Sequence, residues 1–263
     1  MGTMGAITSV RALAVLASVG AATAAAAAEI RVYSSGAPSV AAKAIADSFA
    51  AQGGHHFRFT VGQPATIESD LAAGGQADVV ILPTPAIALL NQSGVLRAGS
   101  AVDLARVGIG VVIRNGGRRP EIGNAAAIRQ LLIDARSVVY PDPRSGGGSA
   151  GRAIAHMIEQ MGVSDIVKPK LILVSAIGGG VDLVAGGKAE VGFFNISEIL
   201  PIKGVTLIGP LPAELQSYIV FDAAIPTRNA APEPAVAYIH ALAAPAASAS
   251  WAKAGLEPLG SKP

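Results

Sequence analysis

The sequence predicts an α/β protein, and three observations support this fold class. Short β-branched segments alternate with alanine-rich helical segments along most of the chain. Loops of glycine, serine and proline separate many of these segments. The composition is 51% hydrophobic but only 4% aromatic, which suits close packing of helices on sheets. With 263 residues, the chain is long enough for two modest lobes or one large domain.

Strands and helices alternate through the first half of the chain. In the segment 39–52, for example, Val40, Ile45 and Phe49 fall on one face of a helix. We expect strands over residues 30–33, 57–61, 78–82 and 107–113, and helices over residues 39–52, 66–74, 85–93 and 121–134.

The same alternation continues to the end of the chain. We expect strands over residues 137–140, 171–174, 191–194, 205–208 and 217–223, and helices over residues 149–161, 179–186, 234–243 and 248–254. This order is typical of βαβ units, and it predicts parallel sheets that helices cover on both faces.

The first 28 residues have the pattern of a secretory signal peptide. Arg11 precedes a short apolar run, and the small residues Ala26 and Ala28 come just before a predicted cleavage at Glu29. The alternative is a transmembrane anchor, but the apolar run is shorter than the roughly 20 residues that span a bilayer. We therefore expect an exported protein from which residues 1–28 are removed.

Charge and cysteine content exclude several classes of function. The formal net charge of +2 argues against nucleic-acid binding, which requires a clustered basic face. Because the chain has no cysteine, disulfides, thiolate metal sites and a lipid-modified cysteine are excluded. His55 and His56 are adjacent, so they would point to opposite faces of a strand, and we expect them in a solvated loop. We expect no metal and no cofactor.

Loops rich in Ser, Gly and Thr follow predicted strands at residues 34–39, 62–66 and 144–152. Ligands of open α/β sheets bind at such positions, and backbone N–H groups at helix starts favour anions. Residues 146–151 match G-x-G-x-x-G, but the next strand lacks the carboxylate of a dinucleotide site. The alternative is a plain surface loop. The sequence lacks the G-x-S-x-G motif of α/β hydrolases. A catalytic triad elsewhere in the chain is not excluded by the sequence.

Three segments of the sequence, and the order in which they occur, resemble those of one known family. They are Glu29-Ile-Arg-Val-Tyr-Ser-Ser-Gly-Ala, then Leu71-Ala-Ala-Gly-Gly-Gln-Ala-Asp-Val-Val-Ile-Leu82, and later Val191-Gly-Phe-Phe-Asn195. Over residues 29–263 this order is similar to the periplasmic solute-binding proteins of ABC transporters, close to the molybdate-binding (ModA-like) type. The resemblance implies a two-lobed periplasmic-binding-protein (type 2) fold with two hinge-crossing strands. Lobe I would comprise residues 29–107 plus 216–263, and lobe II residues 108–215.

The resemblance also implies a ligand site that is shared by five loops. In the molybdate type, hydroxyls of the first two loops, backbone amides of the next two and a tyrosine bind the anion. The matching positions here carry Ala37 in the first loop, Gln63-Pro-Ala65 in the second and Asn195 in place of the tyrosine. The predicted ligand-binding residues are Ser34, Ser35, Gly36, Pro64, Thr66, Arg144, Gly148, Ser149, Ala150, Ile177 and Asn195.

These changes favour a small organic carboxylate as the ligand. Arg144 and Arg152 flank the third loop and could offer bidentate contacts to a carboxylate, the alternative being that both are solvated. We therefore expect a monomeric periplasmic binding protein, and not an enzyme, that passes a small anion to a membrane ABC permease. Molybdate, tungstate or another inorganic oxyanion is the alternative ligand, and an exported α/β hydrolase is the alternative function.

Overall fold

The structure is a computed structural model that describes residue 2 and residues 27–144, 148–175 and 179–260. The predicted signal peptide therefore lies almost entirely outside the described residues. The first part of the fold comprises β1 (Glu29–Ser34), α1 (Gly36–Gly53), β2 (His56–Val61), α2 (Pro64–Ala72), β3 (Val79–Pro83), α3 (Thr84–Gln92) and the long β4 (Val102–Arg114).

The second part begins after β4. It comprises α4 (Ala125–Asp134), β5 (Val138–Pro141), α5 (Gly148–Gln160), α6 (Ser164–Val167), β6 (Leu171–Val174), α7 (Gly179–Ala185), β7 (Val191–Asn195), α8 (Ile196–Ile199) and β8 (Val205–Pro210). The chain then returns through β9 (Tyr218–Ala224), α9 (Pro232–Ala243), α10 (Ser248–Lys253) and β10 (Glu257–Pro258).

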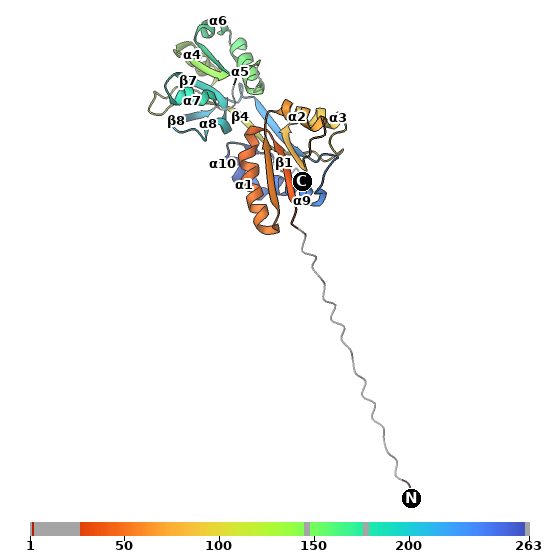
Figure 1. The fold of residues 1–263 in the computed structure, drawn as a ribbon. Coiled ribbons are helices and arrows are strands. Elements are labelled where there is room, and N and C mark those ends of the chain that lie inside the picture. Colours follow the sequence, from red (N-terminus) through yellow and green to blue (C-terminus); the bar gives the residue numbers. More distant parts are fainter. Residues whose placement is uncertain (1, 3–26, 145–147, 176–178, 261–263) are drawn as a thin grey trace.

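The buried side chains divide the molecule into two lobes. Lobe I is built around β1, β3, the start of β4, and β9, with Ile30, Tyr238 and Trp251 in its core. Lobe II is built around the end of β4, β5 and β7, with Ile154 and Phe193 in its core. Figure 1 shows α1, α9 and α10 in one lobe and α4–α8 in the other, with β4 between them.

One continuous path of strands runs through both lobes in the order β2-β1-β3-β9-β4-β7-β5-β6. The strands β1, β2 and β3 are parallel, and so are β5, β6 and β7. The expected parallel pairing is thus present in both lobes, but β4 and β9 run antiparallel to all of their described partners. The chain leaves lobe I along β4 and runs back into it along β9, so these two neighbouring strands have opposite directions.

The strand directions bring together the edges of the two lobes at which the parallel strands end. Both β3 and β4 are antiparallel to β9, so β4 leaves lobe I at the edge where β1, β2 and β3 end. In lobe II, β7 is antiparallel to β4, and its last residue, Asn195, pairs with Ile109. The parallel strands β5 and β6 end at the same edge as β7. Both sets of carboxyl ends therefore face one region, which we call the lobe junction.

The chain crosses the junction in β4 and in the segment before β9. The pairing of β4 with β9 ends at Gly108 and Tyr218, and its pairing with β7 begins at Ile109. Gln216 spans this gap: its Oε1 accepts from the Ile109 N–H at 2.8 Å, and its Nε2 donates to the Ile109 carbonyl at 3.0 Å. A Cβ on Gly108 would lie 2.9 Å from Gln216 Nε2, so a side chain there would displace the Gln216 amide from this position.

Several element boundaries differ from those that the sequence predicts. Helix α1 begins at Gly36, so the first loop is shorter than expected, and β4 begins five residues early, at Val102. The short elements α6, α8 and β10 were not expected, because four or fewer residues carry no detectable period. His55 is buried against Phe49, with the rings stacked at 5.6 Å, which corrects the expectation of a solvated loop.

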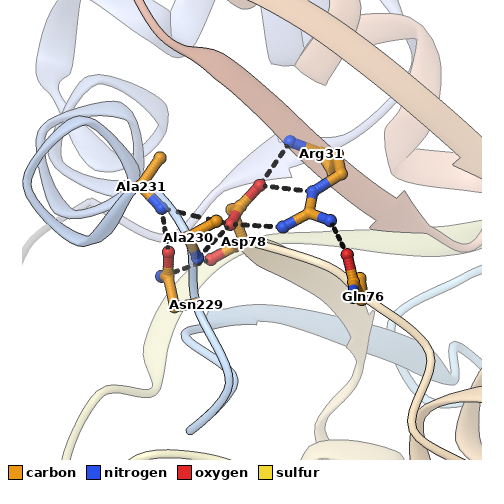
Figure 2. A network of polar contacts seen from close by, with 6 residues as sticks. All are labelled: Arg31, Gln76, Asp78, Asn229, Ala230 and Ala231. Carbon is orange, nitrogen blue, oxygen red and sulfur yellow. Dashed lines mark hydrogen bonds and ion pairs between the residues drawn. The ribbon is translucent and has the colours of Figure 1, made fainter.

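The phrase Gly-Gly-Gln-Ala-Asp-Val has a structural role in lobe I. Asp78 is fully buried at the amino end of β3 and forms an ion pair with Arg31 of β1, with 3.0 Å between Oδ2 and Nε. Asp78 Oδ1 also accepts from the backbone N–H groups of Ala230 and Ala231, just before α9 (Figure 2). This network therefore ties three segments together at the end of lobe I opposite the junction.

Candidate functional site

Two serines of the first predicted loop lie at the lobe junction, at the carboxyl end of β1. Ser34 is fully buried, and its Oγ donates to the Ser35 carbonyl at 2.9 Å. Ser35 precedes α1 and is 5% exposed; its N–H and its Oγ both donate to the Ile81 carbonyl, at 2.9 and 3.5 Å. The two hydroxyls are thus engaged within lobe I.

The other predicted residues of lobe I lie at the starts of its helices. Gly36 is the first residue of α1, and Pro64 is the first residue of α2. Thr66 lies in the first turn of α2 with its side chain exposed. The N-cap of α2 is Gln63, so Thr66 does not cap that helix.

Lobe I also places a hydroxyl and a buried carboxyl group in contact near the junction, a pair that the sequence analysis missed. Thr84 begins α3 directly after β3, and its Oγ1 donates to Asp222 Oδ1 at 3.0 Å. Asp222 lies on β9, opposite Leu82 and Asp103, and is 3% exposed. Burial raises the pKa of Asp222 to about 6; the hydrogen bond from Thr84 opposes this shift, and the charge of Asp103 adds to it.

In lobe II, the third predicted loop is only partly described. Arg144 is exposed and forms a two-point ion pair with Asp142, at 3.0 Å from both Nε and Nη2. Gly148 begins α5, Ser149 follows it with an exposed side chain, and Ala150 is buried. A Cβ on Gly151 would lie 2.3 Å from the Pro141 carbonyl oxygen, so this glycine allows α5 to pack on the end of β5. Ile177 lies outside the described residues.

Asn195 is the predicted residue with the most unusual environment. It ends β7 at the junction and is 7% exposed. Its Nδ2 donates to Glu198 Oε1 at 2.7 Å, whereas its Oδ1 is buried without a partner among the described residues. Burial raises the pKa of Glu198, and the hydrogen bond from Asn195 opposes this shift. Ser197 Oγ is a second buried atom of this segment without a partner in the described part of the chain.

The topology thus brings most of the predicted residues to the junction. Lobe I contributes Ser34, Ser35, Gly36, Pro64 and Thr66, and lobe II contributes Arg144, Gly148, Ser149, Ala150 and Asn195. The sequence analysis missed Thr84, Asp222 and Glu198. Thr84 could have been predicted as a candidate site residue, because it directly follows the buried strand β3.

Other features of the described residues do not point to a different site. A cavity of about 1100 Å³ lies at the far edge of lobe II, near Arg118 and the ion pair of Arg136 with Glu190. It borders the amino ends of β5 and β7, away from the junction. Within residues 27–144, 148–175 and 179–260, no cluster of His, Asp or Glu side chains could hold a metal ion. The helices in these ranges are all too short or too polar to cross a membrane.

The sequence matches the family model of the bacterial extracellular solute-binding proteins over residues 30–257. The chain belongs to this family. The chain is also 31% identical to an aconitate isomerase from a Pseudomonas species over 200 residues, which are 76% of this chain and 74% of that protein. Membership confirms the resemblance to solute-binding proteins of ABC transporters, and it implies export from the cytoplasm.

Solved structures confirm the two-lobed fold. The periplasmic molybdate-binding protein of Azotobacter vinelandii is 18% identical, with a TM-score of 0.66 over 86% of this chain and 98% of that one. The sulfate-binding protein SubI of Mycobacterium tuberculosis is 19% identical, with a TM-score of 0.68 over 88% of this chain and 87% of that one. PEB3 with bound L-phospholactate is 16% identical, with a TM-score of 0.67 over 87% of this chain and 99% of that one.

Proposed function

We propose that this protein binds a small organic carboxylate at the lobe junction and delivers it to an ABC permease. The observation that carries the choice of ligand is the 31% identity to a protein named for aconitate, a tricarboxylate. PEB3, a structural neighbour, holds an organic anion as well. At the junction, helix starts and the hydroxyls of Thr66 and Ser149 offer hydrogen-bond donors to an anion.

The proposal includes how binding is coupled to lobe movement. Lobe I comprises residues 29–107 plus 216–263 and lobe II residues 108–215, so each lobe contributes part of the site. A ligand that touches both edges binds best when the lobes approach, and the crossing residues Gly108 and Gln216 act as the hinge. We further propose a monomer that reaches the periplasm after removal of residues 1–28 and is not lipid-anchored there.

A thermal-shift screen followed by calorimetry tests the choice of ligand. The panel contains citrate, tricarballylate, malate, succinate, cis-aconitate, molybdate and sulfate. A carboxylate at 100 times its Kd should stabilise the protein by about 2.7 kcal/mol. Stabilisation by molybdate or sulfate, with none by the carboxylates, would replace the proposal with inorganic oxyanion transport. Mass spectrometry of material purified without denaturation then identifies any retained acid.

A second candidate function is isomerisation of such an acid in the same site, and the aconitate isomerase relative favours it. Moving a carbon–carbon double bond requires a group that removes a proton and returns one. Asp222 and Glu198 have raised pKa values, which suit such a group. Proton NMR of cis-aconitate separates the two functions. Conversion to the trans isomer in proportion to protein concentration supports an isomerase, and unchanged ligand supports binding alone.

A further inference from the structure

The segment from Asn195 to Glu198 lies where the two lobes meet. Asn195 pairs with Ile109, the residue that follows Gly108 in the crossing strand β4. Helix α8 also borders lobe I. A Cβ on Gly255, between α10 and β10, would lie 3.0 Å from both Ile196 Cγ2 and the Ser197 backbone N. A ligand enclosed between the lobes therefore lies close to this segment.

The hydrogen bonds of Asn195 leave its Oδ1 without a donor among the described residues. An amide side chain has two donor hydrogens on Nδ2 and an acceptor at Oδ1. Glu198 Oε1 accepts from Nδ2 at 2.7 Å, and this hydrogen bond turns Oδ1 away from the Glu198 carboxyl group. A buried carbonyl oxygen without a donor costs free energy of about 1–3 kcal/mol. Within the described part of the chain, Asn195 Oδ1 is thus an unsatisfied acceptor beside the junction.

We propose that Glu198 is a specificity-determining residue that orients Asn195 so that its Oδ1 accepts a hydrogen bond from the ligand. This inference rests on the proposed function, and it narrows the ligand to a hydroxycarboxylate. Fully ionised oxyanions such as molybdate and sulfate have no hydrogen to donate, and a simple polycarboxylate has none either. The hydroxyl of a hydroxy acid supplies the missing donor, while its carboxylates bind the N–H groups and hydroxyls of the site.

Two pairs of acids that differ by one hydroxyl test this inference. Citrate is compared with tricarballylate, and malate with succinate, by calorimetry. The wild-type protein should prefer the hydroxylated member of the better-binding pair by about 10-fold or more, since one satisfied buried acceptor is worth about 1.4 kcal/mol or more.

Three variants assign the preference to these residues. Asn195→Leu removes the acceptor, and Glu198→Leu lets the amide turn its donor toward the ligand, so both variants should bind the two acids of a pair within about 3-fold of each other. Glu198→Gln retains an acceptor for Nδ2 and should keep the preference. Glu159→Leu, an exposed position on α5 of the same lobe, is the matched control.

The outcomes distinguish this inference from the proposed function. Equal binding of both members of a pair to the wild-type protein overturns the inference and leaves carboxylate binding intact. A preference that survives in a folded Asn195→Leu variant also overturns it, even where Glu198→Leu fails to fold. If none of the four acids binds to the folded wild-type protein, the proposed function fails together with the inference.

Discussion

The two edges of the lobe junction differ in how far their polar groups are satisfied. In lobe I, the hydroxyls of Ser34, Ser35 and Thr84 all donate to acceptors of the same lobe. In lobe II, Asn195 Oδ1 and Ser197 Oγ are buried without partners among the described residues. Buried polar groups are normally paired. We therefore call the lobe I edge finished, because its buried hydroxyls have partners. We call the lobe II edge incomplete, because two of its buried polar atoms have none within the described residues.

Under the proposed function, this difference predicts different parts in ligand recognition for the two lobes. A finished edge offers mainly backbone N–H groups at helix starts, which suit any small anion. An unsatisfied buried acceptor selects among anions, because only a ligand with a donor at the right place removes its cost. Stability and selectivity should therefore separate: changes deep in lobe I should alter folding, and changes at the end of β7 should alter ligand choice.

The largest expected effect comes from Asp78, at the end of lobe I opposite the junction. In Asp78→Ala, Arg31 loses its carboxylate partner and the N–H groups of Ala230 and Ala231 lose their acceptor (Figure 2). Breaking a buried pair in this way costs about 3–5 kcal/mol. Denaturant unfolding measures the loss of stability, with Asp165→Ala on the exposed start of α6 as the control.

Substitution of Asp78 should not change the ligand affinity, because the Asp78 network is remote from the junction. If Asp78→Ala does not fold, Asp78→Asn gives the same comparison with less disturbance. A folded variant with wild-type stability, or one with a changed preference between citrate and tricarballylate, would break the proposed division between the lobes.

A smaller effect is expected from Asp222, which is buried beneath Thr84. Its pKa in the folded protein, about 6, lies above the ordinary value of 3.8, so the folded state holds this proton more tightly than the unfolded state. The stability that this provides is present below pH 4 and is lost as the pH rises through 6. Asp222→Asn cannot ionise and should escape this loss.

The measurement for Asp222 is the free energy of unfolding of both proteins at pH 4 and pH 8. The difference, variant minus wild type, should rise by about 2–3 kcal/mol between these two pH values. Asp165→Asn should show no such rise. A difference that is the same at both pH values would mean that Asp222 titrates as a solvated carboxylate.

The sequence predicts the framework of the junction better than its chemistry. The predicted strands end close to the observed carboxyl ends, and Ser35 and Asn195 therefore lie beside the junction. Thr84 and Asp222 escaped notice because their relation depends on the antiparallel pairing of β3 with β9, which lie far apart in the sequence. Glu198 escaped notice because α8 has only four residues, too few for a helical period.

The hinge provides the next test, because both lobes depend on the same crossing strand. In Gln216→Leu, the Ile109 N–H loses its acceptor, whereas the Ile109 carbonyl still accepts from the Leu211 N–H. We expect a loss of about 1–3 kcal/mol in the free energy of unfolding, as for other buried polar groups that are left unpaired. The affinity for citrate should change as well, because the hydrogen bonds between Gln216 and Ile109 favour one relative position of the lobes.

Gln130→Leu is a suitable control for the hinge variant. Gln130 lies exposed on α4, where its side chain donates to Asp134 at 2.8 Å. Equal stability of the two variants would show that the hydrogen bonds between Gln216 and Ile109 do not stabilise the crossing strand β4.

The smallest effects on folding, and the sharpest test of a shared site, come from Thr66 and Ser149. Both hydroxyls are exposed at helix starts, one in each lobe. Each alanine variant should therefore keep the wild-type melting temperature. If each hydroxyl donates to the bound carboxylate, each change should weaken citrate binding by about 10-fold or more, since a hydrogen bond to a charged group is worth about 1.5–3 kcal/mol.

Ser69→Ala, one turn beyond Thr66 on the exposed face of α2, should leave the affinity unchanged and is the matched control. If Thr66→Ala weakens binding and Ser149→Ala does not, the anion is held by lobe I alone. The finished edge would then be the whole site for the carboxylates, and lobe II would only select for the hydroxyl. Equal weakening in both variants means that the lobes share the anion between them, so that closure itself depends on carboxylates contacting both edges.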